Sequence, residues 1–417
     1  MKETSMKKRK TALVLGGGGS RGAYEIGVWQ ALRELGIKID MVFGTSVGSI
    51  NGALIVQDDF DVAVKLWREI TTNMIFDIDL PEPKKSEKSP KTKLIENVKE
   101  RIAERAGFSI DEAKAYAKEI IKNGGASAGG LSALLNKYID EEAIQNSDIE
   151  YGLITVQLPS FSPSYLYKED IAAGKLRDFI IASSTVAPAI KKQVIDGKEY
   201  IDGGFYDSIP VSMALEKGAT DIIAVDLQAI GVLRHEDLIM AQENSDSFTF
   251  ISSAWDMGSM LIFEKGNSRK LIRLGYLDAM KVYEILAGHY YTFPRGEFDK
   301  KTMHEADLAA KIFNLDPSII YRKDTLNEYL AEALKAHKNT MKKDFRFGAK
   351  VFTELAMEAL DAAQLIGKKI SRQTLTILIA EELAKNPGNP LISSRAAKKL
   401  LKEELSAAAY LIKHKLI

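Results

Sequence analysis

Cysteine is absent from the 417 residues of this chain, which excludes disulfides, thiolate metal sites and a cysteine nucleophile. No stretch comes near the roughly 18–20 consecutive apolar residues that a membrane-spanning helix needs. An excess of either charge is also lacking, because 57 Lys and Arg residues balance 57 Asp and Glu residues. A protein devoted to nucleic acid usually carries a clear basic excess, so we expect no nucleic-acid partner.

The N-terminus is basic, but the apolar run that follows it at 11–15 is too short for a secretory signal and predicts a buried strand. With 46% hydrophobic and 27% charged residues, the chain has the composition of a folded globular protein. Together with the absence of cysteine, this favours a cytoplasmic protein, either free in solution or bound to a membrane only at its surface.

Strand and helix signals alternate between about residues 9 and 228. The short apolar runs that predict strands are 11–15, 41–43, 151–158, 164–167, 199–201 and 221–227. The segments with helical signals are 23–35, 47–56, 60–70, 175–182 and 210–217. This alternation predicts an α/β domain whose mostly parallel sheet is covered by helices on both faces, giving three layers.

An insertion interrupts this pattern between about residues 77 and 148. It is rich in charge and contains a glycine-rich stretch at 124–130. An ordinary surface loop and a mobile lid hinged at these glycines are both consistent with that composition. From residue 229 strand signals fade, and helical periodicity predicts an α-helical C-terminal region of unknown role. The helices expected there are 325–338, 351–365, 372–385 and 394–413.

The segment between the first predicted strand and helix contains four consecutive glycines, followed by Ser20, Arg21 and Gly22. Gly17, Gly19 and Gly22 match the G-x-G-x-x-G pattern of dinucleotide sites, which also needs an acidic residue about 20 positions later. Asp40 stands at that distance, but it precedes a strand. The alternatives are a tight turn and an oxyanion hole, in which backbone N–H groups stabilise a carbonyl oxygen during acyl transfer.

Gly44-Thr45-Ser46-Val47-Gly48 matches G-x-S-x-G, with a predicted strand before it and a helix after it. In this motif the serine occupies a sharp strand-to-helix turn, and the flanking glycines avoid steric clash. Ser46 is therefore a candidate nucleophile, although a serine at this position is also a common helix N-cap.

A serine nucleophile needs a general base. The five histidines all follow the α/β region, and the first of them, His235, stands in a polar stretch. Asp202 is the better candidate, because it ends a predicted strand and precedes Gly203 and Gly204. An aspartate before glycines is also common in turns, so a structural role stays open for it.

Three of these motifs, in this order, resemble those of the patatin-like phospholipases. Gly17 to Gly22 is similar to the family's G-G-G-x-[KR]-G loop, Gly44 to Gly48 to its nucleophile elbow, and Asp202-Gly203-Gly204 to its D-G-[GA] motif. The segment 182–188 is similar to a further stretch that precedes the family's aspartate.

The resemblance implies an α/β hydrolase that cleaves lipid acyl esters with a Ser46–Asp202 dyad, without histidine, metal or cofactor. It implies that Gly17, Gly18 and Gly19 supply or shape the oxyanion hole, and that Arg21 and Gly22 complete that loop. The partner would be a lipid or another acyl-ester substrate. The residues after Pro188 and Ser208 depart from the family pattern, which leaves the substrate preference open. The sequence does not specify the oligomeric state.

Two other classes compete with this hypothesis. A nucleotide-binding protein would use the glycine loop but would leave the Ser46 and Asp202 motifs unexplained. An inactive scaffold would be expected to lack one of the motif residues, and none is missing.

For membrane contact, the basic terminal segment 393–417 and the insertion are candidates, although packing on the protein's own core is the alternative for such segments. The basic stretch 267–276 is expected to pack on the catalytic part.

Overall fold

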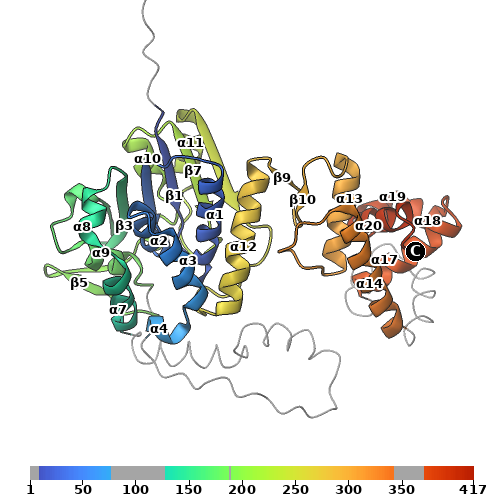
Figure 1. Cartoon of the computed structure of the whole chain (residues 1–417), viewed down its shortest axis with the longest axis horizontal. Helices are drawn as coiled ribbons and strands as arrows, with labels where there is room; N and C mark the ends of the chain where they lie inside the picture. Colours follow the sequence, from blue (N-terminus) through green and yellow to red (C-terminus); the bar gives the residue numbers. More distant parts are fainter. Residues whose placement is uncertain (1–8, 77–126, 187–188, 342–370) are drawn as a thin grey trace, which may run out of the picture. The chain divides into compact units, whose positions relative to one another are not determined.

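The computed structural model describes residues 9–76, 127–186, 189–341 and 371–417, and the chain divides into two compact units, Met1–Val282 and Tyr283–Ile417. The first unit is an α/β domain built on one sheet, and the second consists mainly of helices (Figure 1). Much of the charged insertion and the predicted helix 351–365 lie outside the described residues.

The described residues of the first unit form an eight-stranded sheet in the order β5-β6-β3-β2-β1-β7-β8, with β4 paired to β3. Strands β1, β2, β3, β7 and β8 are parallel, whereas β4 and β6 run antiparallel to β3, and β5 runs antiparallel to β6. The strands are β1 (Thr11–Leu15), β2 (Met41–Thr45), β3 (Glu150–Leu158), β4 (Ser162–Tyr167), β5 (Gln193–Ile195), β6 (Lys198–Asp202), β7 (Asp221–Asp226) and β8 (Ser247–Ser252).

Helices cover both faces of this sheet, as predicted. Their bounds are α1 (Ala23–Glu34), α2 (Val47–Val56), α3 (Phe60–Glu69), α4 (Thr72–Phe76), α7 (Gly129–Tyr138), α8 (Glu141–Asn146), α9 (Leu176–Ser183), α10 (Val211–Glu216), α11 (His235–Asn244) and α12 (Lys265–Val282). Helices α10 and α11 contact each other on one side, while α1 contacts α2, α3 and α12 on the other. The three-layer α/β fold expected from the sequence is therefore confirmed.

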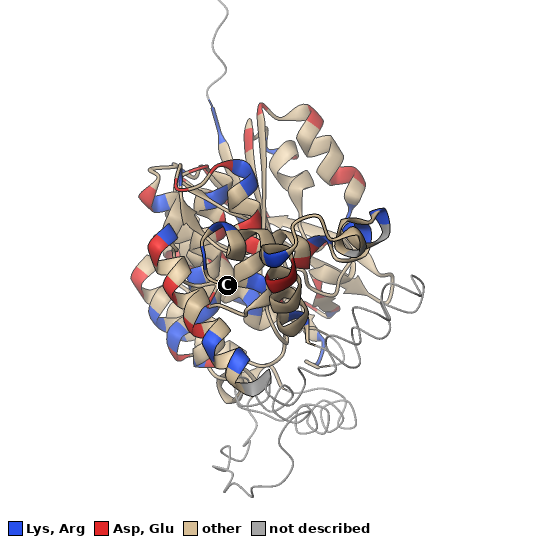
Figure 2. Cartoon of the chain, turned by 90° about the vertical axis from the view of Figure 1, so that its right-hand side faces the viewer, with Lys and Arg blue, Asp and Glu red and all other residues tan. Residues whose placement is uncertain are grey.

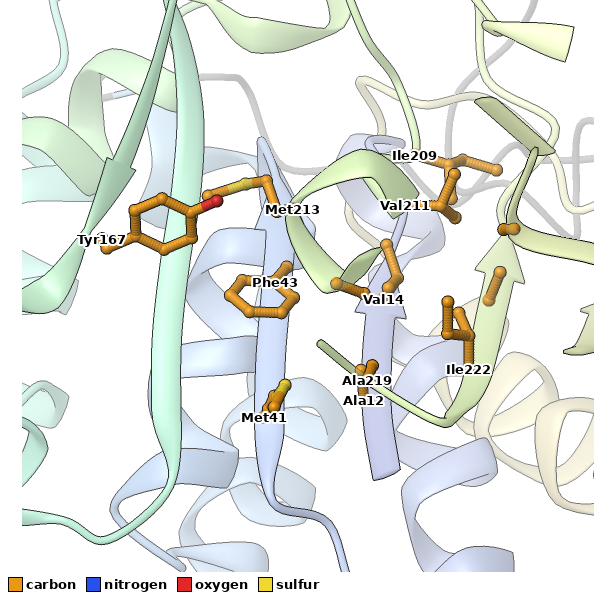
Figure 3. Packing of buried hydrophobic residues seen from close by; sticks show 13 residues of the cluster. Ala12, Val14, Met41, Phe43, Tyr167, Ile209, Val211, Met213, Ala219 and Ile222 are labelled. Atoms are coloured by element: carbon orange, nitrogen blue, oxygen red, sulfur yellow. The ribbon is translucent and has the colours of Figure 1, made fainter. Parts of the chain in front are cut away.

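Alternate residues of the central strands build the core on the α10 side of the sheet. Val14 of β1 and Phe43 of β2 are fully buried and pack with Val211 and Met213 of α10, and Phe43 meets the Tyr167 ring edge-on at 5.9 Å (Figure 3). Burial of such side chains is the main source of stability in a domain of this size.

The first unit extends further than the 9–228 expected from the sequence. It includes β8, which pairs with β7, and α12, which packs along α1. Strand β8 gave no clear strand signal because it lies at the edge of the sheet, and only Ile251 of its six residues is buried. The expectation that the basic stretch 267–276 packs on the catalytic part is confirmed, since Leu271 and Leu274 of α12 are buried.

The second unit contains a two-stranded ribbon and a group of helices. The strands are β9 (Leu286–Ala287) and β10 (Phe293–Pro294), and the helices are α13 (Lys300–Ile312), α14 (Lys323–Met341), α17 (Arg372–Lys385), α18 (Pro390–Ser393), α19 (Arg395–Leu400) and α20 (Lys402–Lys413). The predicted helix 394–413 is thus divided at Leu401.

The apolar residues of the terminal segment pack largely inside the second unit. Leu401 and Leu411 are buried, and α20 contacts α13 and α17. Basic and acidic residues are interspersed along the described helices around the C-terminus (Figure 2). Arg372, for example, pairs with both Glu403 and Glu404 of α20. Packing on its own core therefore accounts for the amphipathic pattern of this segment.

Candidate active site

Ser46 occupies the sharp turn between β2 and α2 that the sequence predicted. Its φ of 55° and ψ of −125° lie in a region that costs a residue with a side chain roughly 1–3 kcal/mol. The flanking glycines make the turn possible: a Cβ on Gly44 would lie 2.3 Å from the Gly48 carbonyl oxygen, and one on Gly48 would lie 2.4 Å from the Leu15 oxygen. The chain therefore accepts strain at Ser46 and leaves no room for side chains beside it.

Hydrogen bonds with two other serines hold this turn. The hydroxyl of Ser49 donates to the Ser46 carbonyl oxygen at 2.6 Å. The Ser46 N–H donates to Ser183 Oγ at 2.9 Å, and Ser183 Oγ in turn donates to the Ile154 carbonyl at 2.7 Å. Ser183 belongs to the segment 182–188, whose contribution to the site was not specified by the sequence.

The strand register brings Asp202 next to Ser46. Thr45, the last residue of β2, pairs with Ile154 of β3, and the following β3 residue, Thr155, pairs with Asp202 at the end of β6. Because Ser46 directly follows Thr45, it leaves β2 at the level of Thr155, the residue that Asp202 pairs with on the other side of β3. Ser46 and Asp202 come together although 156 residues separate them in the sequence (202 − 46).

The Asp202 carboxyl is buried, with only one oxygen fully engaged. Oδ1 accepts the Gly204 N–H at 2.7 Å, whereas Oδ2 has no hydrogen bond. Burial raises the pKa of Asp202 to about 6, and the nearby Ser46 hydroxyl and the Gly204 N–H act in the opposite direction. The Ser46 hydroxyl thus lies close enough to influence the carboxyl without the geometry of a full hydrogen bond.

The glycine loop lies beside Ser46, with two backbone donors uncommitted. A Cβ on Gly17 would be 3.4 Å from the Ser46 Cβ, but the Gly17 N–H itself donates to the Ser208 carbonyl at 3.0 Å. Within the described residues, the N–H groups of Gly18 and Gly19 donate to no carbonyl or side chain, and both residues line the same pocket as Ser46. Gly17 therefore shapes the loop, and Gly18 and Gly19 carry its available donors.

Arg21 holds the loop in place. Its guanidinium donates to the carbonyl oxygens of Leu227, Gln228 and Gly258, which belong to two separate segments after β7 and β8. These contacts give Arg21 the role of fixing the geometry of the loop. Gly22 packs so closely that a Cβ would lie 2.5 Å from the Val47 side chain.

A buried polar network behind the glycine loop was not recognised from the sequence. The Asn51 amide, on α2, donates to the Gly22 carbonyl at 3.0 Å and to the Glu25 carboxyl at 2.7 Å, and it accepts the Trp67 indole N–H at 2.8 Å. Burial raises the pKa of Glu25 well above its usual value. Every residue of α1 from 23 to 29 is buried. This part of the helix therefore has no exposed polar face, and the sequence pattern did not distinguish the buried Glu25 from an ordinary surface glutamate.

An apolar pocket opens onto these groups. Besides Ser46, Asp202, Gly18 and Gly19, its wall consists mainly of large apolar side chains of α2, α3, α4 and α7 and of the segment after β8. Val47, Ile50 and Leu54 line it along one side of α2, and at 1.5 Å per helical residue Leu54 lies about 12 Å beyond Ser46. Ile190 and Ser208, where the sequence departs from the family pattern, also line the pocket.

The competing acidic and basic candidates lie elsewhere. Asp40 precedes β2 and so lies at the amino-terminal end of the central strands, whereas the glycine loop follows the carboxyl end of β1. There the Asp40 carboxylate accepts the Thr11 N–H. A ribose hydroxyl at the loop would therefore be out of its reach, which argues against the dinucleotide hypothesis. His235 begins α11, is exposed, and is not among the residues that line the pocket.

A second buried carboxyl lies close to Asp202 in the sequence. Asp207 accepts hydrogen bonds from the Tyr165 hydroxyl at 3.1 Å and from the Ile209 N–H at 3.2 Å. Burial raises its pKa to about 6 as well. Unlike Asp202, Asp207 has a partner for each oxygen and is not part of the pocket wall.

The described residues contain no group of three or more acidic or histidine side chains placed to hold a metal ion. Within the same residues, no helix is both long and apolar enough to span a membrane.

Part of the first unit is similar to proteins of one known family. The model of the family described as "Patatin-like phospholipase" matches residues 13–215. Patatin-like phospholipase domain-containing protein 7 of Rattus norvegicus is 23% identical over 285 residues, which are 67% of this chain and 18% of that protein. Lysophospholipase nte1 of Aspergillus terreus is 28% identical over 227 residues, 53% of this chain and 12% of that one.

The chain therefore spans less than a fifth of the length of these curated relatives. Among solved structures, VipD from Legionella pneumophila is 12% identical, with a TM-score of 0.40 over 99% of this chain and 92% of that one.

Proposed function

The chain belongs to the patatin-like phospholipase family through residues 13–215, and on this premise we propose that it is a serine acyl-hydrolase of lipid acyl esters. Ser46 is the nucleophile, Asp202 the general base, and the N–H groups of Gly18 and Gly19 form the oxyanion hole. The observation that carries the proposal is the convergence of a strained serine, a half-engaged buried carboxylate and two uncommitted backbone donors on one apolar pocket.

In the first half of the reaction, Ser46 Oγ attacks the acyl carbonyl carbon and its proton passes to Asp202 Oδ2. The carbonyl oxygen becomes negatively charged and is stabilised by the Gly18 and Gly19 N–H groups and by the N-terminal end of α2. As the tetrahedral intermediate collapses, the bond to the leaving alcohol breaks, and the alcohol oxygen takes the proton from Asp202. The acyl group then remains on Ser46.

In the second half, a water molecule attacks the acyl carbon and gives one proton to Asp202. The second tetrahedral intermediate collapses, the bond to Ser46 Oγ breaks, and the Asp202 proton returns to that oxygen. The fatty acid leaves and the dyad is restored. With a pKa of about 6, Asp202 is ionised at neutral pH yet basic enough to share a proton with the reacting oxygens.

The pocket supports an acyl chain as the bound part of the substrate. Its wall is apolar beyond the reacting groups, and it follows α2 for about 12 Å from Ser46. A fatty acyl chain gains free energy from burial there, whereas a polar headgroup would lose its hydration. The name of one relative, lysophospholipase, supports a phospholipid ester as substrate.

Hydrolysis of p-nitrophenyl esters and of a phospholipid panel tests the proposal. We expect the wild-type protein to release fatty acid, and Ser46→Ala and Asp202→Asn to lose nearly all of that activity. Asp207→Asn is the matched control, because it makes the same change at a buried carboxyl of similar pKa that does not line the pocket. Full activity in Ser46→Ala would contradict the proposal, and equal losses in both aspartate variants would remove the assignment of Asp202 as base.

A further inference from the structure

Three uncharged stretches lie in the loops around the mouth of the pocket, although 27% of the chain is charged. They are 203–206 after Asp202, 227–233 after β7, and 257–263 before α12. The same loops carry Asp207, Arg234, Asp256 and Glu264 just outside these stretches. The apolar side chains of the stretches include some of the most exposed in the described structure: Ile230 is 92% exposed, Val232 47% and Phe205 44%. We call these three stretches the apolar rim.

The rim is a connected part of the surface. The Val232 N–H donates to the Gly204 carbonyl at 2.9 Å, which joins the second loop to the first. The Ile230 N–H contacts Met260 Sδ at 3.4 Å, which joins the second to the third. Arg21 also donates to carbonyls of the second and third loops, so both are fastened to the glycine loop.

The rim is continuous with the pocket. Ile230 lines the pocket entrance and is also the most exposed large apolar residue described, and Met260 and Leu261 of the third loop line the same pocket. Exposed apolar side chains cost free energy in water, and a connected group of them marks a surface with a partner.

We infer that the apolar rim is the surface by which this protein docks onto a lipid layer, with Ile230 and Val232 entering the acyl region. This inference rests on the proposed function, because an acyl ester held in a lipid layer reaches Ser46 through the mouth that the rim surrounds. The absence of charge in these three stretches fits insertion of their apolar side chains among lipid tails, so we expect burial of apolar area to drive the binding.

Vesicle binding by a catalytically inert protein tests the inference separately from catalysis. The parent protein is Ser46→Ala, and the probe is sedimentation with phosphatidylcholine vesicles, which carry no net charge. Ile230→Asp and Val232→Asp in this background are expected to partition at least about tenfold more weakly, because an apolar anchor is replaced by a charge.

Val282→Asp is the matched control. It makes the same substitution at a valine that is 42% exposed, at the last residue of α12. That helix starts near the rim and, with 18 residues, extends about 27 Å away from it. The control is expected to bind vesicles like the parent.

The inference is overturned if the parent does not bind vesicles, if Val232→Asp binds as tightly as the parent, or if Val282→Asp loses binding equally. It is also overturned if Val232→Asp instead dissociates an oligomer in sedimentation velocity, since the rim would then be covered by a second copy. Should the wild type hydrolyse no ester while the rim variants still lose vesicle binding, the docking surface stands and the proposed function fails.

Discussion

Phe43 and Ser46 are three residues apart, yet they belong to regions of opposite character. Phe43 lies in the middle of β2, fully buried among apolar side chains in ordinary strand geometry (Figure 3). Ser46 lies just beyond the end of the same strand, with a positive φ and a buried carboxyl beside it. The buried interiors of the strands stabilise the fold. At the carboxyl ends of the strands, backbone strain and unpaired polar groups lower that stability.

The Asp202→Asn variant shows the contrast most strongly. We expect hydrolysis to fall by about 10³-fold or more, because the amide cannot accept the Ser46 proton. Folding raises the pKa of Asp202 from its ordinary value to about 6, so the ionised carboxyl destabilises the native state at neutral pH, increasingly as the pH rises from about 4 to 6. The variant should therefore gain free energy of unfolding, by up to about 3 kcal/mol.

Denaturant unfolding at pH 7 and pH 4 checks this prediction. The chain's three tryptophans, Trp29, Trp67 and Trp255, all lie in the first unit, so their fluorescence follows that unit alone. The stabilisation should be present at pH 7 and largely vanish near pH 4, where the wild-type carboxyl is protonated. A variant that is both inactive and less stable at pH 7 would show that Asp202 supports the fold.

Phe43→Ala should have the opposite profile. Removing the ring leaves a cavity against Tyr167 and Met213 and is expected to lower the free energy of unfolding by about 3–5 kcal/mol. Activity per folded molecule should change far less than in Asp202→Asn. The same tryptophan fluorescence measures the stability, and titration of active sites gives the folded fraction. A large loss of turnover in the folded protein would mean that the two regions are not separable.

Asn51→Ala should weaken catalysis through position alone. It removes the amide that joins the Gly22 carbonyl, Glu25 and Trp67, and with it the tie between the glycine loop and α2. We expect kcat to fall by about 10–100-fold with a smaller change in KM. Gln57→Ala, which removes an amide at the other end of α2, is the control. If kcat per folded molecule stays at the wild-type value, the network is structural only.

Leu54→Trp should alter chain-length preference. The larger side chain would shorten the pocket about 12 Å from Ser46, so hydrolysis of p-nitrophenyl palmitate should fall by about tenfold relative to the butyrate ester. Leu54→Met conserves volume and should keep the wild-type ratio. An unchanged ratio in the tryptophan variant would mean that acyl chains do not extend along α2.

The pH dependence of hydrolysis is the smallest of the expected effects. It tests which of two buried carboxyls, Asp202 or Asp207, controls the activity. Activity should rise with pH through about 6, because Asp202 acts as a base only when ionised. Asp207 has a pKa of about 6 as well, so a profile from the wild type alone does not identify the group. Asp207→Asn is expected to keep the rise near pH 6. If the rise in activity near pH 6 were absent in Asp207→Asn, the group that titrates would be Asp207 and not Asp202.

The sequence predicted those features that local residue patterns encode. Glycines beside Ser46 reveal a sharp turn because side chains would clash there, and Asp202 ends a strand before glycines. The order of these motifs was enough to predict the fold and the family. The sequence could not show which distant residues pair, such as Thr155 with Asp202 or Arg21 with the Leu227 carbonyl. Likewise, β8 gave no signal, since a strand at the sheet edge needs little apolar alternation.

Mapping of a fluorophosphonate adduct by mass spectrometry tests the central claim, a serine activated by aspartate without histidine, most directly. The account predicts a single adduct on Ser46 in the wild type, a strongly slowed reaction at the same residue in Asp202→Asn, and wild-type rates in Asp207→Asn and His235→Ala. An adduct on another residue, or loss of labelling in His235→Ala with Asp202→Asn unaffected, would contradict it.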